Sequence, residues 1–253
     1  MIEPRNKAKR KKILLLAYVV FLLILLFSGL LLSPLFKVKI VEVSGAKEIN
    51  PDEIRANVEH KNLLFITVSG LKKDLAEKFP QIAQMNIEKK LFEKTIIISL
   101  TEREKLGIVC KAVTNENNEE NIGECFYIDK TGTIFKNAPQ TSGSLVLLIK
   151  DFSLEEFSLG KEMFSPQAMN AITDLRDNLY AQTGAKPLWF AFLTYPPQEI
   201  KLMTSEGWYV FFDLSRDAKN QLSILKTALT EKIPDRTKLE YIDLRIEGRI
   251  YYK

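Results

Sequence analysis

FKVKIVEVSGAKEINPDEI, residues 36–54, holds the pattern that decides the fold of the first folded segment. Apolar and charged residues alternate over residues 36–43, which is typical of a strand with one buried face. A Ser-Gly pair ends the alternation. Asn50 and Pro51 then predict a helix start, because asparagine caps helices and proline fits their first turn. The stretch therefore predicts a strand followed by a short helix.

The sequence up to residue 104 predicts a second helix and two more strands. Leu71, Leu75 and Phe79 recur every four residues, and Pro80 ends that helix. A strand follows, with one face expected to hold Ala83, Met85, Ile87 and Leu91. The residues LFEK turn the chain into TIIISLTER, a strand rich in β-branched residues. The order β-α-α-β-β predicts two helices over one face of a three-stranded sheet.

An uninterrupted apolar run, ILLLAYVVFLLILLFSGLLL, occupies residues 13–32. About 20 apolar residues in a helix span the hydrocarbon core of a bilayer. Residues 1–12 carry a net charge of +5, and a basic flank of this kind stays on the cytoplasmic side. We therefore expect a basic cytoplasmic tail at 1–12 and a transmembrane helix at 13–35. The rest of the chain would lie outside the cytoplasmic membrane, and the bilayer would be a partner of residues 13–35.

A cleaved signal peptide is the alternative for this run, and it would release the remainder as a secreted protein. Signal peptides usually have about 7–15 apolar residues before a small-x-small cleavage site. The run here is longer, and GLLLSPLF has no clean site of that kind. The basic tail also accounts for the formal charge of +4, since the rest of the chain sums to −1. A nearly neutral body disfavours nucleic-acid binding.

Cys110 and Cys125 flank a polar stretch, TNENNEEN at 114–121, that has the composition of a hairpin loop. GIVCKAV and ECFYID would then be paired strands. Two cysteines in a non-reducing compartment favour a disulfide at the base of that loop. The alternative is two unpaired thiols.

Residues 105–253 predict a β-rich domain with two helices. Ser165 and Ser215 are the expected helix N-caps, each followed by an apolar stripe at helical spacing. Apolar runs separated by turn residues predict strands on both sides of Asp129–Gly132 and at 144–150, 187–195, 199–204, 208–214 and 241–253. We expect a mostly antiparallel sheet covered by the two helices, and an α+β fold for the whole chain.

No motif points to enzyme chemistry. The single histidine, His60, sits in a polar stretch and is expected on the surface. Two carboxylates could hydrolyse a glycosidic bond, and the candidates are Asp129, Asp151, Glu155 and Asp243. Each also fits a turn, a cap or a surface charge. We therefore expect no catalytic, cofactor-binding or metal-binding residues, with a membrane-anchored cell-wall hydrolase or carbohydrate-binding module as the alternative.

The chain closes with YIDLRIEGRIYYK, residues 241–253, which predicts two strands, or one bent strand, around Glu247-Gly248. A strand at the edge of a sheet presents unpaired backbone groups to which a partner can add a strand. Arginine and tyrosine are common anchors at such surfaces. The alternative is an internal strand that closes the core.

Several segments together resemble the bacterial cell-division family FtsQ, called DivIB in some lineages. FKVKIVEVSGAKEINPDEI and the residues from NLLFITV to SLTERE resemble an FtsQ-type POTRA domain. CFYIDKTGTIFK resembles the entry to the family's second domain, and YIDLR at 241–245 its closing motif. The resemblance implies a POTRA domain at 36–104 and an FtsQ-type β domain at 105–253.

The resemblance also implies a function without catalysis. Members of this family are scaffolds at the division septum, and they dock coiled-coil proteins of the FtsB (DivIC) and FtsL types, which help control septal peptidoglycan synthesis. We expect those partners to add a strand at the C-terminus, and other divisome membrane proteins to bind as well. The expected partner-binding residues are Tyr241, Arg245, Ile246, Arg249, Ile250, Tyr251 and Tyr252, with Glu102 and Arg103 as a possible second site. A POTRA chaperone-like secreted protein remains the third hypothesis.

Overall fold

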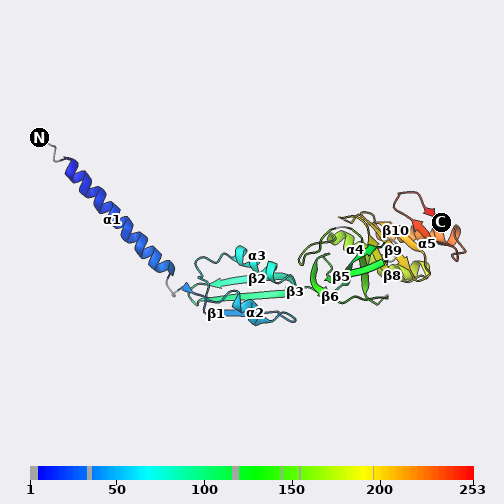
Figure 1. The fold of residues 1–253 in the computed structure, drawn as a ribbon, viewed down its shortest axis with the longest axis horizontal. Helices are drawn as coiled ribbons and strands as arrows, with labels where there is room; N and C mark the ends of the chain where they lie inside the picture. The colour runs from blue at the N-terminus through cyan, green and yellow to red at the C-terminus, as the bar shows by residue number, and fades with distance from the viewer. Residues whose placement is uncertain (1–4, 33–35, 116–119, 144, 154, 196) are drawn as a thin grey trace. The chain divides into compact units, whose positions relative to one another are not determined.

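The computed structural model describes residues 5–32, 36–115, 120–143, 145–153, 155–195 and 197–253. Outside this description lie residues 1–4 and 33–35 of the expected tail and span, residues 116–119 of the expected hairpin loop, and residue 144 of an expected strand. The chain divides into two compact units between Glu102 and Arg103 (Figure 1).

The first helix, α1 (Arg5–Leu32), covers the apolar run and part of the basic tail. Its apolar residues are distributed around the whole circumference rather than along one stripe. In the described part of the chain, no helix has both the length and the apolar character that a membrane crossing requires. The expected transmembrane helix is therefore not confirmed.

The rest of the first unit has the predicted order β-α-α-β-β. Its elements are β1 (Ile40–Ser44), α2 (Pro51–Ala56), α3 (Val68–Lys78), β2 (Ile82–Lys90) and β3 (Thr95–Glu102). The sheet order is β1-β3-β2, with β1 parallel and β2 antiparallel to the central strand. Helix α2 lies beside β1 and α3 beside β2 (Figure 1), so the two helices close one core with the sheet.

Local chemistry explains these boundaries. The Asn50 side chain accepts a hydrogen bond from the N–H of Asp52, which caps α2 as predicted. The turn after β1 requires glycine, since Gly45 has a φ of 86°. A Cβ atom there would lie 1.9 Å from the carbonyl oxygen of Leu100. Residue 45 therefore allows β1 to leave the sheet directly against β3.

The predicted inner face of β2 is partly wrong. Ala83 is exposed, and Leu91 is exposed within the turn that follows the strand. The register of β2 against β3 shifts between Ile82 and Gln84, so a bulge brings Ile82 into the core in place of Ala83. A one-residue irregularity of this kind reverses the side-chain alternation and leaves no sequence signal.

The second unit contains a nine-stranded sheet and two helices. Its elements are β4 (Gly107–Thr114), β5 (Glu120–Ile128), β6 (Ile134–Ala138), β7 (Leu147–Asp151), α4 (Pro166–Thr183), β8 (Pro187–Phe192), β9 (Glu199–Thr204), β10 (Tyr209–Asp213), α5 (Ala218–Glu231), β11 (Tyr241–Asp243) and β12 (Tyr251–Tyr252). The sheet order is β12-β11-β10-β9-β8-β7-β4-β5-β6. Helix α4 joins the parallel neighbours β7 and β8, and α5 joins the parallel neighbours β10 and β11.

This sheet is mixed. Among its described strands five neighbouring pairs are antiparallel and three are parallel. The two helices pack together and share one core with the sheet, so an α+β fold with a β-rich second unit is confirmed. The opposite side has a smaller cluster around the two cysteines. That side, which we call the open face, is not covered by α4 or α5.

One predicted helix cap is wrong. Ser165 caps α4 as expected, accepting from the N–H of Ala168. Helix α5 is capped by Asp217 instead of Ser215, and the Asp217 side chain accepts from the N–H of Asn220. Ser215 donates to the Asp213 carboxylate in the preceding turn. Both residues favour N-caps, and the end of β10 decides which one is used.

Candidate functional site

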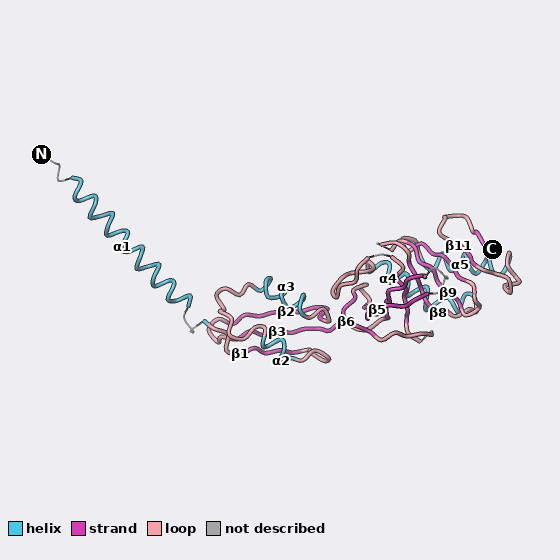
Figure 2. The backbone as a smooth tube through the Cα atoms, in the orientation of Figure 1, coloured by secondary structure: helices cyan, strands magenta, loops and turns pink. Residues whose placement is uncertain are grey.

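The last strand, β12, forms one edge of the nine-stranded sheet. It pairs antiparallel with β11, with Ile242 opposite Tyr252 and Asp243 opposite Tyr251. The C-terminus accordingly lies close to β11 (Figure 2). Residues 240–253 are called the C-terminal edge below.

The backbone of Tyr252 faces away from the sheet. Tyr241 and Lys253 exchange two hydrogen bonds, with N···O distances of 3.2 and 3.3 Å. In antiparallel pairs such hydrogen-bonded positions alternate with positions whose N–H and C=O point outward. The next pair, Ile242 with Tyr252, is of the second kind. The C-terminal edge therefore presents the N–H and C=O of Tyr252 to a strand that could be added.

The two tyrosines of β12 lie on opposite faces of the sheet. Tyr252 is opposite Ile242, which is buried on the helix side, and Tyr251 is opposite Asp243, on the open face. Tyr251 is 45% exposed and Tyr252 52% exposed. An added strand would thus meet one aromatic side chain on each face.

The turn before β12 exposes two isoleucines. The N–H of Arg249 donates to the carbonyl oxygen of Ile246 at 3.2 Å, and Gly248 has a φ of 70°, as a tight turn requires. Ile246 and Ile250 are both exposed. They extend the apolar surface of the C-terminal edge beyond the tyrosines.

Arg245 is held by its own chain. Its guanidinium donates to both Asp243 carboxylate oxygens, at 2.9 and 2.6 Å, and to Glu199 at 2.5 Å. Hydrogen bonding to Asp243 is the main cause that raises the pKa of Arg245, and the same bond lowers the pKa of Asp243. The guanidinium also lies 4.7 Å from the Phe211 ring centre. This side chain fixes the end of β11 as well as lining the predicted partner surface.

Tyr241 belongs to an aromatic row on the open face that the sequence analysis missed. Its ring stacks on Tyr209 with centres 5.9 Å apart. The Lys201 ammonium lies 3.9 Å from the Tyr209 ring centre and 5.7 Å from that of Trp189. Burial lowers the pKa of Lys201. Outward aromatic residues on successive strands were a usable signal, but the row required knowledge of the strand order.

Glu102 and Arg103, the possible second partner site, each bind to residues of their own unit. Glu102 accepts hydrogen bonds from the backbone N–H groups of Lys47, Glu48 and Ile49, at 2.6 to 3.0 Å. Burial acts to raise the pKa of Glu102, and these bonds lower it overall. The second partner site stays a prediction.

Arg103 pairs with Asp129 in the second unit, at 2.5 Å. The other Asp129 oxygen accepts from the N–H groups of Thr131 and Thr133. Burial acts to raise the pKa of Asp129, but the hydrogen bonds from Thr131, Arg103 and Thr133 lower it overall. The carboxylate therefore organises the turn between β5 and β6.

Cys110 and Cys125 are joined by a disulfide, directly opposite each other on β4 and β5. Both residues are buried on the open face, against Ile108 and Leu148. The bond ties together two neighbouring strands in the half of the sheet that ends in β6.

Asp243 and Asp151 are too far apart to act as a hydrolytic pair. Asp243 on β11 and Asp151 on β7 are separated by three strands, or ~19 Å at the usual strand spacing. Asp129 is engaged by Arg103, and Glu155 is exposed and lies 3.3 Å from Lys161. Paired catalytic carboxylates stand about 5–10 Å apart. Among the described residues, no group of three or more histidine, cysteine or acidic side chains could hold a metal ion.

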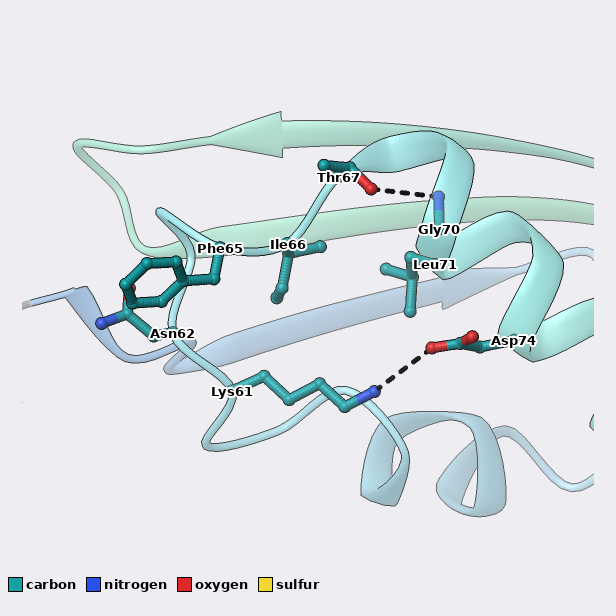
Figure 3. Close-up of a pocket in the computed structure, with 8 residues that line it drawn as sticks. All are labelled: Lys61, Asn62, Phe65, Ile66, Thr67, Gly70, Leu71 and Asp74. Atoms are coloured by element: carbon teal, nitrogen blue, oxygen red, sulfur yellow. Dashed lines mark hydrogen bonds and ion pairs between the residues drawn. The ribbon is translucent and has the colours of Figure 1, made fainter. Parts of the chain in front are cut away.

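The first unit contains an open pocket of about 370 Å³ next to the start of α3. Its lining residues are Lys61, Asn62, Phe65, Ile66, Thr67, Gly70, Leu71 and Asp74. Figure 3 shows Phe65 and Asn62 at one end, away from Leu71 and Asp74, and an ion pair between Lys61 and Asp74. The pocket has one acid, so it lacks the groups for paired-carboxylate chemistry.

Residues 36–103 match the family described as POTRA domain, FtsQ-type. Residues 36–103 are thus an FtsQ-type POTRA domain. The match confirms the resemblance to the FtsQ/DivIB family that the sequence indicated, and it points to a scaffold role in cell division through protein–protein interactions. No curated protein matches the chain.

Proposed function

We propose that the chain is a non-enzymatic scaffold of the bacterial division machinery. The FtsQ-type POTRA domain, which follows the apolar run at residues 13–32, is the observation that carries this proposal. Residues 1–12 would be the cytoplasmic tail, 13–35 the membrane anchor, 36–104 the POTRA domain and 105–253 the β domain, outside the cytoplasmic membrane at the division septum. Support for the anchor comes from α1, whose side chains from Ile13 to Leu26 are exposed and mostly apolar.

The docking site in this proposal is the C-terminal edge. A segment of an FtsB- or FtsL-type coiled-coil protein would add a strand beside β12, using the outward N–H and C=O of Tyr252. Its alternate side chains would contact Tyr251 on the open face and Tyr252 on the helix side. The outward backbone of an edge strand and the exposure of both tyrosines support this mode.

A truncation that ends at Gly248 tests the docking site. It removes β12, which pairs only with β11 among the described strands, so the second unit should still fold. We expect lost binding of the coiled-coil partner and recruitment to midcell that is retained at least in part. Unchanged partner affinity would refute the addition of a partner strand beside β12, and it would not affect the proposed scaffold role.

Tyr252→Pro and Tyr252→Ala form a matched pair for the backbone contribution. Proline removes the outward N–H, and alanine keeps that N–H while removing the ring. If strand addition is the mode, proline should weaken partner binding clearly more than alanine, as measured by titration calorimetry. Equal losses would mean that the tyrosine ring, and not backbone pairing, holds the partner.

Fractionation tests the anchor separately. The full chain should remain with the membrane after salt washing, as a spanning protein does. Recovery of a soluble form that begins near residue 33 would instead support secretion after cleavage.

A further inference from the structure

One end of the POTRA domain exposes apolar side chains from three separate segments. Phe92, in the turn between β2 and β3, is fully exposed, and Phe65, in the loop before α3, is 62% exposed. Leu64, Leu91 and Ile40 add exposed apolar area from the same segments and from the start of β1. Several large exposed apolar side chains gathered at one end of a small domain mark a contact surface.

Backbone hydrogen bonds hold these segments together around residues 36–40. The N–H of Leu63 donates to the carbonyl oxygen of Phe36 at 2.7 Å, which fixes the loop that carries Phe65. The N–H of Lys39 donates to the carbonyl oxygen of Lys94 at 2.9 Å, which fixes the turn that carries Phe92. Both phenylalanine-bearing segments therefore flank the start of the domain.

The start of the domain is close to α1 along the chain. Phe36 is four residues beyond Leu32, the last residue of α1. Four residues reach at most ~14 Å when fully extended. This step rests on the proposed membrane anchor: if α1 spans the bilayer, the exposed end of the domain cannot be far from the outer lipid surface.

The charges of this end suit a lipid surface. Its basic side chains are Lys37, Lys39, Lys61, Lys89, Lys90 and Lys94. Lys61 pairs with Asp74 at 3.9 Å, Lys89 donates to the carbonyl oxygen of Ile66 at 2.9 Å, and Lys90 pairs with Glu93 at 3.4 Å. Lysine can lay its apolar stem on such a surface and reach phosphate with its ammonium group. Phenylalanine and leucine beside lysine are the composition of surfaces that lie in the headgroup boundary.

We propose that this membrane-proximal end of the POTRA domain rests on the outer surface of the cytoplasmic membrane. Phe65 and Phe92 enter the boundary between headgroups and acyl chains, and Lys37, Lys39 and Lys94 contact lipid phosphates. The occupant is a phospholipid surface, because the chain length from α1 and the excess of positive charge both favour it. The contact would fix the orientation of the POTRA domain relative to the membrane.

Tryptophan substitution in the full chain tests the proposal. Phe92→Trp and Phe65→Trp place a reporter at each tip, in nanodiscs of phosphatidylglycerol and phosphatidylcholine with or without brominated acyl chains. Leu22→Trp, in the middle of the apolar run, reports on the anchor. Leu145→Trp, at a fully exposed position in the second unit, is the matched control. The native tryptophans are the common background of all four variants.

We expect brominated lipid to cause a loss of the added emission at positions 22, 65 and 92, and no loss at 145. Loss at 22 without loss at 65 and 92 would overturn the lipid contact and leave the anchor standing, and the exposed end would then be a surface for a protein. No loss at 22 would overturn the anchor and the inference together. Equal loss at 145 would show unspecific adsorption and would also overturn the inference.

Discussion

The two edge strands of the nine-stranded sheet, β6 and β12, differ in whether their outward backbone groups are hydrogen-bonded within the chain. At β6, the N–H of Ile134 donates to the carbonyl oxygen of Lys161 at 3.0 Å, and its carbonyl oxygen accepts from Gly160 at 2.7 Å. Residues 160–162 thus cover that edge at the start of β6. At β12 the backbone of Tyr252 points outward, and no further described strand pairs with it. The chain's own backbone therefore covers the start of one edge strand, whereas no described strand covers the outward backbone of Tyr252 at the other edge.

Burial follows the same division. Ile134 and Phe135 of β6 are buried, whereas Tyr251 and Tyr252 of β12 are half exposed. The edge at β6, called the closed edge, should thus matter for stability, and the edge at β12, called the open edge, for binding. The predictions below test this difference, in order of decreasing effect.

Gly132→Ala should have the largest effect, at the closed edge. Gly132 has a φ of 83°, and a Cβ atom would lie 2.0 Å from the carbonyl oxygen of Phe164. The strained backbone and the clash together should cost about 3 kcal/mol or more. Urea unfolding measures the loss of stability.

Gly248→Ala, in the turn before β12, is the matched control. Its φ is 70°, but no atom lies within 4 Å of a Cβ atom built at this position, so a loss of about 1 kcal/mol is expected. Equal losses would remove the contrast between the edges.

Replacing both cysteines, Cys110→Ser with Cys125→Ser, should cost about 3 kcal/mol, because a disulfide across a loop of this length restricts the unfolded chain. The stability loss is measured by urea unfolding under oxidising conditions. Partner affinity should not change, since the bond lies between β4 and β5, on the side of the sheet that ends in β6. A large loss of partner affinity in the folded double variant would contradict this expectation and would show that the β6 and β12 edges are energetically coupled.

Asp129→Asn should cost about 1–3 kcal/mol near neutral pH, because it weakens a buried, charge-assisted network with Arg103. The pKa of Asp129 is lowered on folding. Its stabilising effect is therefore present above the unfolded pKa of about 3.9, and it is lost as the pH falls through the folded pKa. Unfolding free energies of wild type and variant should converge in acid. If the difference in unfolding free energy between wild type and variant stays constant down to low pH, the loss of stability comes from altered hydrogen-bond geometry and not from the lost charge.

Tyr252→Pro should have the smallest effect on stability, within about 0.5 kcal/mol, because its outward N–H donates to no strand of the sheet. Its large effect is expected on partner affinity. A clear drop in the melting temperature would indicate that the Tyr252 N–H already has a structural role, and it would weaken the case for an open edge.

Much of the fold was predictable from local signals. Alternation at 36–43, the Asn50 cap and the apolar spacing of Leu71 and Leu75 predicted the order of the POTRA domain. Such local signals failed where contacts with neighbouring segments decided which residue is buried or caps a helix. The bulge at Ile82 exposed Ala83, and the end of β10 moved the cap of α5 from Ser215 to Asp217. For the candidate site, the sequence indicated Tyr251 and Tyr252 but missed Trp189 and Lys201, because Lys201 reaches the rings of Trp189 and Tyr209 only through the strand order.

By itself, the sequence determined which segments become strands and helices, because periodicity and capping act over a few residues. It also indicated that the C-terminal segment, residues 241–253, has strand character. Only the tertiary structure decided that β12 is an outer strand, that Arg245 is bound by Asp243 and Glu199, and that residues 160–162 cover the start of β6. The reason is physical. Strand order and edge closure depend on hydrogen bonds between segments far apart in the chain, and no local pattern encodes which partner a strand will find.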